Sequence, residues 1–103
     1  MKWSKIEKEV SRRAFDTAYR RECNSIAAKL KEMIEVASSP SDVWQIHNYL
    51  TKQRKLTDAK YDYRYSVIIL VFSRLLKEGW INEADLKGLH EEKIEKIKYL
   101  SSM

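Results

Sequence analysis

The segment that decides the fold is "YSVIILVFSRLLKEG", residues 65–79. Its apolar run, Val67–Phe72, would by itself be interpreted as a buried strand, because it is rich in β-forming residues. Its flanks favour a helix, since apolar side chains recur there at helical spacing and Gly79 stands where helices commonly end. These side chains are Tyr61, Tyr65, Ile68, Ile69, Phe72, Leu75 and Leu76. A lone strand would lack partners, so we predict a helix at the centre of a bundle, buried on most sides.

The composition supports an all-helical chain around this segment. The 103 residues suffice for one small domain, and they include two glycines and one proline. A third of the chain is charged, with 34% Asp, Glu, Lys and Arg. Few turn residues and many charges favour long helices over sheets. We therefore predict a single all-α domain spanning residues 1–103, with no linker or repeat.

A long N-terminal helix is predicted over about residues 4–37. Ser4 and Glu7 have the spacing of a capping box, and apolar residues then recur every three or four positions without Gly or Pro. A helix of this length exceeds what a small core can cover, so we expect part of it to pack on a second chain. The prediction is a long N-terminal helix plus a compact helical bundle, in a homodimer. The remaining helices are predicted at about 40–57, 59–78, 83–87 and 89–101, with a break near residues 57–58 and a kink at Gly88.

The second helix contains "DVWQIHNYLTKQR", residues 42–54, in which one tryptophan faces away from the apolar stripe. At 100° per residue, one predicted core face holds Val43, Ile46, Tyr49, Leu50 and Leu56. Trp44 falls roughly opposite, in a polar set with His47, Asn48, Thr51 and Arg54. Either the long helix or a second subunit covers this ring, or the ring is an exposed anchor for a partner. A dimer covering part of the ring would satisfy both interpretations.

The basic balance of the chain raises nucleic acid as a partner. The formal net charge is +5, but acidic residues interrupt the basic face of the long helix, which favours a solvated surface. Residues 60–65 interleave Lys60 and Arg64 with three tyrosines, as single-strand binders do. The same residues can be core tyrosines with cationic side chains lying over them. We keep a small nucleic-acid-binding domain as the weaker alternative and expect no nucleic-acid partner.

Catalytic, metal and membrane functions find no support in the sequence. His47 and His90 are far apart and Cys23 is the only cysteine, so no pair has metal-ligand spacing. Cys23 within a helix is better explained as a packed small residue than as a nucleophile, and a single cysteine fits a reducing compartment. The longest apolar run has six residues, far too few for a membrane span. We expect a non-enzymatic cytoplasmic protein without metal, cofactor or integral membrane association.

Residues 42–80, "DVWQIHNYLTKQRKLTDAKYDYRYSVIILVFSRLLKEGW", resemble the cyanobacterial fluorescence recovery protein family. That family shows D-[L/V]-W-x-[L/I]-H-D-[F/Y]-L, then an Arg, then D-G-K-Y-D-x-R-x-S-V-[L/I]-I and L-L-K-E-G. The opening "WSKIEKEVSRRAFDTAYRRE", residues 3–22, and the closing "LKGLHEEKIEKIKYL", residues 86–100, fit as well. The resemblance therefore covers nearly the whole chain without large gaps.

This resemblance implies an all-helical homodimer that acts in photoprotection. The family binds the C-terminal domain of the light-activated red form of the orange carotenoid protein. It speeds return to the orange form and detachment from the phycobilisome, so that antenna fluorescence recovers. No cofactor is implied, and the expected location is cytoplasmic, including a peripheral one at the cytosolic face of the thylakoid near phycobilisomes. The alternative is a homologue with the same dimeric fold that binds a different protein.

The resemblance also implies a partner-binding surface and a dimer interface. Trp44, His47 and Arg54 match the family's functional residues, whereas Asn48 stands where the family usually has Asp. Other departures are Leu70 in place of a common Phe and Ala59 in place of Gly. The partner-binding residues expected here are Trp44, His47, Asn48, Arg54, Leu70 and Lys96. The dimer interface expected here consists of Val43, Trp44, Leu30, Met33 and Ile34.

Overall fold

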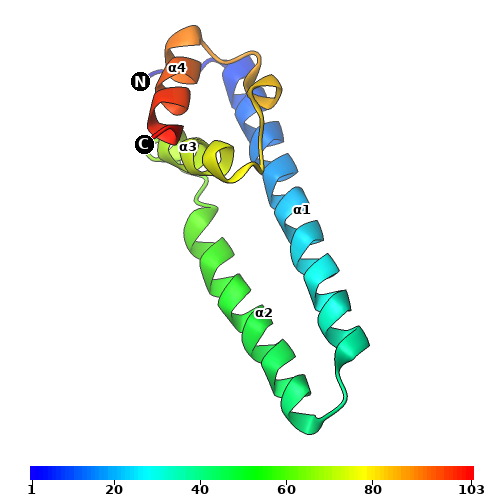
Figure 1. The fold of residues 1–103 in the computed structure, drawn as a ribbon. Coiled ribbons are helices and arrows are strands. Elements are labelled where there is room, and N and C mark those ends of the chain that lie inside the picture. Colours follow the sequence, from blue (N-terminus) through cyan, green and yellow to red (C-terminus); the bar gives the residue numbers. More distant parts are fainter.

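The computed structural model describes residues 1–103 and is built from helices without strands, which confirms the all-α prediction. Its elements are α1 (Lys5–Val36), α2 (Pro40–Lys60), α3 (Ile68–Glu78), the short 3₁₀ helix η1 (Glu83–Leu86) and α4 (Glu91–Ser101). Figure 1 shows α1 and α2 as a long antiparallel hairpin, with α3 and α4 against the N-terminal half of α1 at one end. We call residues 1–22 and 61–103 the head, and residues 23–60 the arm. The molecule measures 53 × 27 × 22 Å along its principal axes.

Capping side chains set where the helices begin. Ser4 Oγ accepts a hydrogen bond from the Glu7 amide at 3.1 Å, and the Glu7 carboxylate accepts one from the Ser4 amide at 3.0 Å, which confirms the predicted capping box. Asp42 holds the start of α2 by accepting hydrogen bonds from the amides of Ser38 and Ser39. These acceptors satisfy amides that have no partner inside the helix.

The predicted break between the second and third helices is in the wrong place. α2 runs without interruption to Lys60, and residues 61–67 lie outside the helices, so helix 59–78 begins only at Ile68. The reason is aromatic packing: the rings of Tyr61 and Tyr63 both meet Phe15 edge to face, at centroid distances of 5.4 and 4.9 Å. Side chains two positions apart point the same way only in extended backbone, not in a helix. The last helix also starts two residues late, at Glu91.

The hydrophobic core lies entirely within the head. α3 and α4 pack closely on each other, η1 packs on α1, and the N-terminal half of α1 contributes buried residues to the same core. Each large apolar side chain buried here stabilises the fold by about 1.5–3 kcal/mol. The thirteen buried apolar residues are Val10, Ala14, Phe15, Ala18, Ile68, Ile69, Val71, Phe72, Leu75, Ile81, Leu86, Leu89 and Ile97.

At Gly88 the backbone passes very close to Val10 of α1. The glycine's φ of +112° lies in a region that side chains rarely adopt, and a Cβ there would stand 2.6 Å from Val10 Cγ2. The predicted kink at Gly88 is therefore a close approach of the chain to α1. Gly79, with φ +85° and open space around it, ends α3 as the sequence predicted.

The arm has a half-buried seam instead of a core, because none of residues 23–56 is buried. The inner face of α2 follows Ile46, Tyr49, Gln53, Thr57 and Lys60, a spacing of three and four residues. Among these inner residues, only Ile46 and Tyr49 belong to the stripe that the sequence predicted for the core face of the helix. Three of that stripe's five residues are exposed: Val43, Leu50 and Leu56. The prediction failed because the polar Gln53, Thr57 and Lys60 take the inner positions near the head.

A charged cluster joins the arm to the head. The buried ammonium of Lys60 lies 2.6 Å from carboxylate oxygens of both Glu22 on α1 and Glu78 at the end of α3. Tyr61 donates a hydrogen bond from its hydroxyl to Glu22 at 2.8 Å. We call Lys60, Glu22, Glu78 and Tyr61 the junction cluster. It fixes the last turn of α2 to both other elements.

Candidate protein-binding surfaces

The outer face of α2 carries four of the sequence-predicted partner-binding residues together. We call Trp44, His47, Asn48 and Arg54 the arm patch. Trp44 is 65% exposed, and its ring meets the His47 ring edge-on at a centroid distance of 6.4 Å. His47 Nδ1 lies 3.5 Å from the Asn48 side-chain oxygen. The orientation of Trp44 away from the inner face of the helix agrees with the sequence analysis.

The arm patch can supply both buried area and directed hydrogen bonds to a partner. Arg54 donates from Nε to Asp58 at 2.9 and 3.1 Å, and this hydrogen bond raises the pKa of Arg54. Because Nε makes that contact, the terminal nitrogens of the guanidinium are available to a partner's carboxylate. Trp and Arg are enriched among the few residues that dominate binding energy at protein interfaces.

Besides the exposed Trp44, the residues predicted for the dimer interface fall into two groups. Val43 and Ile34 are 55% and 56% exposed on the arm, so a second chain can reach them. Leu30 and Met33 are half-buried. Met33 lines a shallow pocket with Ile46 on α2, so it contributes mainly to the seam within one chain.

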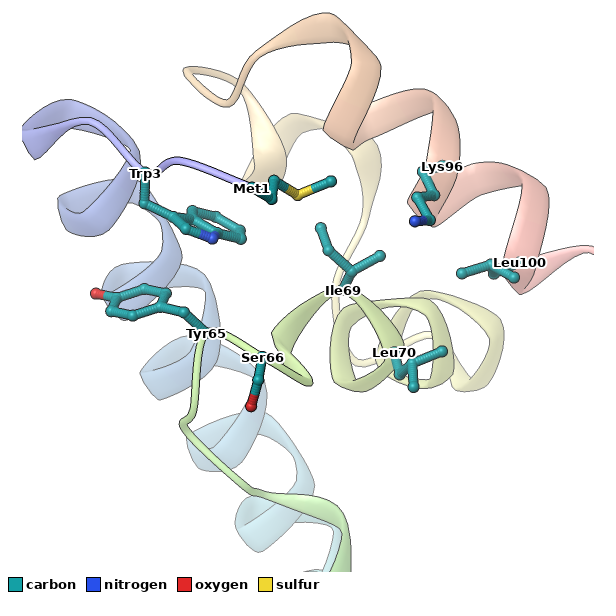
Figure 2. A pocket seen from close by; sticks show the side chains of 8 residues that line it. All are labelled: Met1, Trp3, Tyr65, Ser66, Ile69, Leu70, Lys96 and Leu100. Atoms are coloured by element: carbon teal, nitrogen blue, oxygen red, sulfur yellow. The ribbon is translucent and has the colours of Figure 1, made fainter.

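Leu70 and Lys96 lie in a different place, on an open pocket of the head with a volume of about 450 Å³. Figure 2 shows Ile69 in the middle of the pocket, Trp3 and Tyr65 on one side, and Lys96 and Leu100 on the other. Met1 and Ser66 complete the lining. The structure therefore separates the predicted partner-binding residues into the arm patch and this head pocket.

Sequence reasoning missed the buried ionic clusters. Hydrogen bonds from Lys93 and from the His90 and Ser4 amides lower the pKa of Glu7 from 4.5 to about 2. Burial alone would raise the pKa of Glu78, but hydrogen bonds from Lys60 and Arg74 outweigh it and lower that pKa. Burial, then the hydrogen bond to Glu22, raises the pKa of Tyr61. One signal in the sequence could have revealed the junction cluster. Gln53, Thr57 and Lys60 are spaced three and four residues apart, so they lie on one face of a helix and indicate a polar inner face.

The structure contains neither a group of metal ligands nor a membrane-spanning helix. No three side chains of the metal-binding types His, Cys, Asp and Glu are grouped closely enough to hold an ion. None of the helices combines the length and apolar character needed to cross a bilayer. Cys23 is half-buried on α1 beside Tyr19, whose pKa it raises.

The chain is similar to known proteins over nearly its whole length. The family model described as "Photoprotection regulator fluorescence recovery protein" covers residues 3–101. The fluorescence recovery protein of Synechocystis sp. PCC 6803 is 37% identical over 101 residues, which are 98% of this chain and 93% of that protein. The solved structure of the Fremyella diplosiphon fluorescence recovery protein has a TM-score of 0.92 and 42% identity, and the match covers 99% of this chain and 100% of that one. The solved Synechocystis structure gives a TM-score of 0.93 and 36% identity at the same coverage.

The matches in sequence and the matches in structure indicate the same family. The region that the family model matches spans the arm patch and the two head-pocket residues that the sequence singled out, Leu70 and Lys96. The chain belongs to the fluorescence recovery protein family of photoprotection regulators.

Proposed function

We propose that this chain is a non-enzymatic regulator that binds the C-terminal domain of the red, light-activated orange carotenoid protein. Binding speeds return to the orange form and detachment from the phycobilisome, which restores antenna fluorescence. The observation that carries this proposal is the arm patch, where an exposed Trp and a guanidinium stand on one helix face in a member of this family. A regulator that binds the relaxation transition state more tightly than the red state lowers the barrier without covalent chemistry.

The proposal includes a homodimer formed through the arm. Val43 and Leu50 lie seven residues apart, which returns a helix to within about 20°, so they share a flank of α2. Both are exposed, as are Ile34 and Val36 near the end of α1. An arm without a buried core gains stability when a second copy covers such apolar side chains. Leu70 and Lys96 would then serve as a second contact with the partner, away from the arm patch.

The direct test follows the red-to-orange reaction in the dark with purified carotenoid protein. Substoichiometric amounts of this chain should shorten the recovery half-time, because each regulator molecule acts repeatedly. Trp44→Leu should weaken partner binding by about 2 kcal/mol, a typical hot-spot loss, and Arg54→Leu should act similarly. Ile6→Ala is the control, since Ile6 is 65% exposed on α1 and belongs to neither the arm patch nor the head pocket. Unchanged recovery at molar excess of the unmodified chain would contradict the proposal.

One observation favours a second candidate, a different protein partner for the same fold. Asn48 beside His47 supplies hydrogen-bonding atoms but no negative charge to the arm patch. A partner that relies on an ion pair there would bind less tightly. Asn48→Asp should strengthen binding of the carotenoid protein under the first proposal. Under the second, it should have no effect on that protein.

A further inference from the structure

The head pocket is lined mainly by hydrophobic residues, and the Lys96 side chain is directed into it. Six of its eight lining residues are hydrophobic: Met1, Trp3, Tyr65, Ile69, Leu70 and Leu100. Its volume of about 450 Å³ lies within the range of about 300–1,000 Å³ found for small-molecule sites. Figure 2 shows the Lys96 nitrogen directed toward the space above Ile69. Lys96 makes no ion pair with any carboxylate of the chain.

The wall opposite Lys96 is fixed before any ligand arrives. Trp3 and Tyr65 pack at a centroid distance of 5.3 Å, and the ammonium of Lys93 lies 4.4 Å from the centroid of the Trp3 ring. That ammonium is itself held by Glu7 at 2.7 Å and by the Lys2 carbonyl. A wall positioned in this way needs little ordering upon binding, which favours affinity.

We propose that this pocket binds a small amphipathic anion, with an apolar body of about ten carbon atoms and one anionic group. The apolar body lies over Ile69 between the Trp3–Tyr65 wall and Leu100. The anionic group pairs with the free ammonium of Lys96, and the Ser66 hydroxyl is the only other side-chain polar group outside the aromatic wall. Charge complementarity selects the occupant: a neutral apolar molecule would leave Lys96 unpaired, and a small inorganic anion would leave the apolar lining uncovered.

Binding of such an anion would also exclude a protein partner from Leu70 and Lys96. That consequence rests on the proposed function, because it assumes that the carotenoid protein contacts these residues. The site itself does not depend on it. A ligand titration of the chain alone therefore tests the pocket, whereas the recovery assay tests binding of the carotenoid protein. Failure of the pocket proposal can thus be distinguished from failure of the proposed function.

The test is a titration with decanoate below its critical micelle concentration, followed by the indole N–H signals of Trp3, Trp44 and Trp80 in two-dimensional NMR. Decanoate should shift the Trp3 signal to saturation and leave Trp44 unmoved. Decanol and acetate, which each lack one of the two features, should bind at least tenfold more weakly. Lys96→Gln should weaken decanoate about tenfold without changing decanol. Leu70→Asp should abolish decanoate binding, because it places a carboxylate at the rim.

Lys98→Gln is the matched control, since Lys98 is an exposed lysine on the same helix that pairs with Glu83 and does not line the pocket. Three outcomes would overturn the proposal. Decanoate could fail to shift the Trp3 signal, or it could shift Trp44 equally, which would indicate binding to the exposed arm. Equal weakening by Lys96→Gln and Lys98→Gln would show a general charge effect rather than a site.

Discussion

The head and the arm of this molecule are both helical, but different interactions hold them together. The head contains all thirteen buried apolar residues, and its close contacts include an aromatic row from Trp3 to Phe15. The arm has two long helices, no buried residue between positions 23 and 56, and exposed apolar side chains along its flanks. The comparison teaches that one chain can complete the core of the head, whereas it leaves apolar side chains of the arm uncovered.

The largest expected effect comes from emptying the core of the head. Phe72 is completely buried, so Phe72→Ala should lower the free energy of unfolding by about 3–5 kcal/mol. Leu56→Ala, on the exposed flank of the arm, should change it by only about 0.5 kcal/mol. Urea unfolding followed by circular dichroism measures both. Similar losses at the two positions would show that the arm has a core of its own and would remove the contrast.

The junction cluster should be nearly as costly to disrupt. Lys60→Met removes the one ammonium between Glu22 and Glu78 and leaves two carboxylates near each other without a cation. Breaking a buried ion pair in this way costs about 3 kcal/mol or more. Part of the loss should disappear at low pH, because a protonated Glu78 no longer repels the Glu22 carboxylate. Lys55→Met, at an exposed position of the same helix, is the control and should be nearly neutral in thermal unfolding.

Alanine substitutions at the two glycines distinguish the effect of close packing on stability from the effect of backbone conformation. Both have positive φ, so alanine is strained at either position by about 1–2 kcal/mol. Only at Gly88 would the new Cβ also strike Val10, which lies in the core, and overpacking adds about 1 kcal/mol or more. Gly88→Ala should therefore lower the melting temperature further than Gly79→Ala does. Equal effects would mean that the head yields easily at this contact.

Glu7 gives the head a pH dependence through a buried carboxylate. Glu7→Gln should cost about 2 kcal/mol near neutral pH, through lost charged hydrogen bonds to Lys93 and the His90 amide. The folded pKa of Glu7 is about 2 and its ordinary value is 4.5. A lowered pKa stabilises the fold above 4.5, and this contribution is lost as pH falls from 4.5 toward 2. The difference between wild type and Glu7→Gln should shrink over that range. Glu9→Gln, at an exposed position of the same helix, is the control and should change the free energy of unfolding at neutral pH by only about 0.5 kcal/mol.

The sequence was informative where local patterns determined the structure. The helical period of residues 68–76 and Gly79 predicted the type and the end of α3, though not its start at Ile68, and the capping box at Ser4 predicted the start of α1. It failed where polar residues took inner positions. Thr57 and Lys60 continue α2 past the predicted break. The ammonium of Lys60 is stable in its buried position because it lies beside the carboxylates of Glu22 and Glu78, which are distant from it in the sequence. Trp3 and Tyr65 form one wall of a pocket for a similar reason, since 62 positions separate them and no local pattern joins them.

The smallest effect on an isolated chain, and the sharpest test of the arm, is expected from Val43→Glu. Val43 is 55% exposed, so the charge should alter the free energy of unfolding of one chain by only about 0.5 kcal/mol. If the arm flank joins two copies, the same charge is buried twice in the interface and the dimer should dissociate. Light scattering at micromolar concentration measures the change. Gln45→Glu is the control, because two residues further the helix has turned about 200° and the added charge faces elsewhere. A wild-type monomer, or equal dissociation by both variants, would show that the exposed apolar flank of the arm does not hold a second copy.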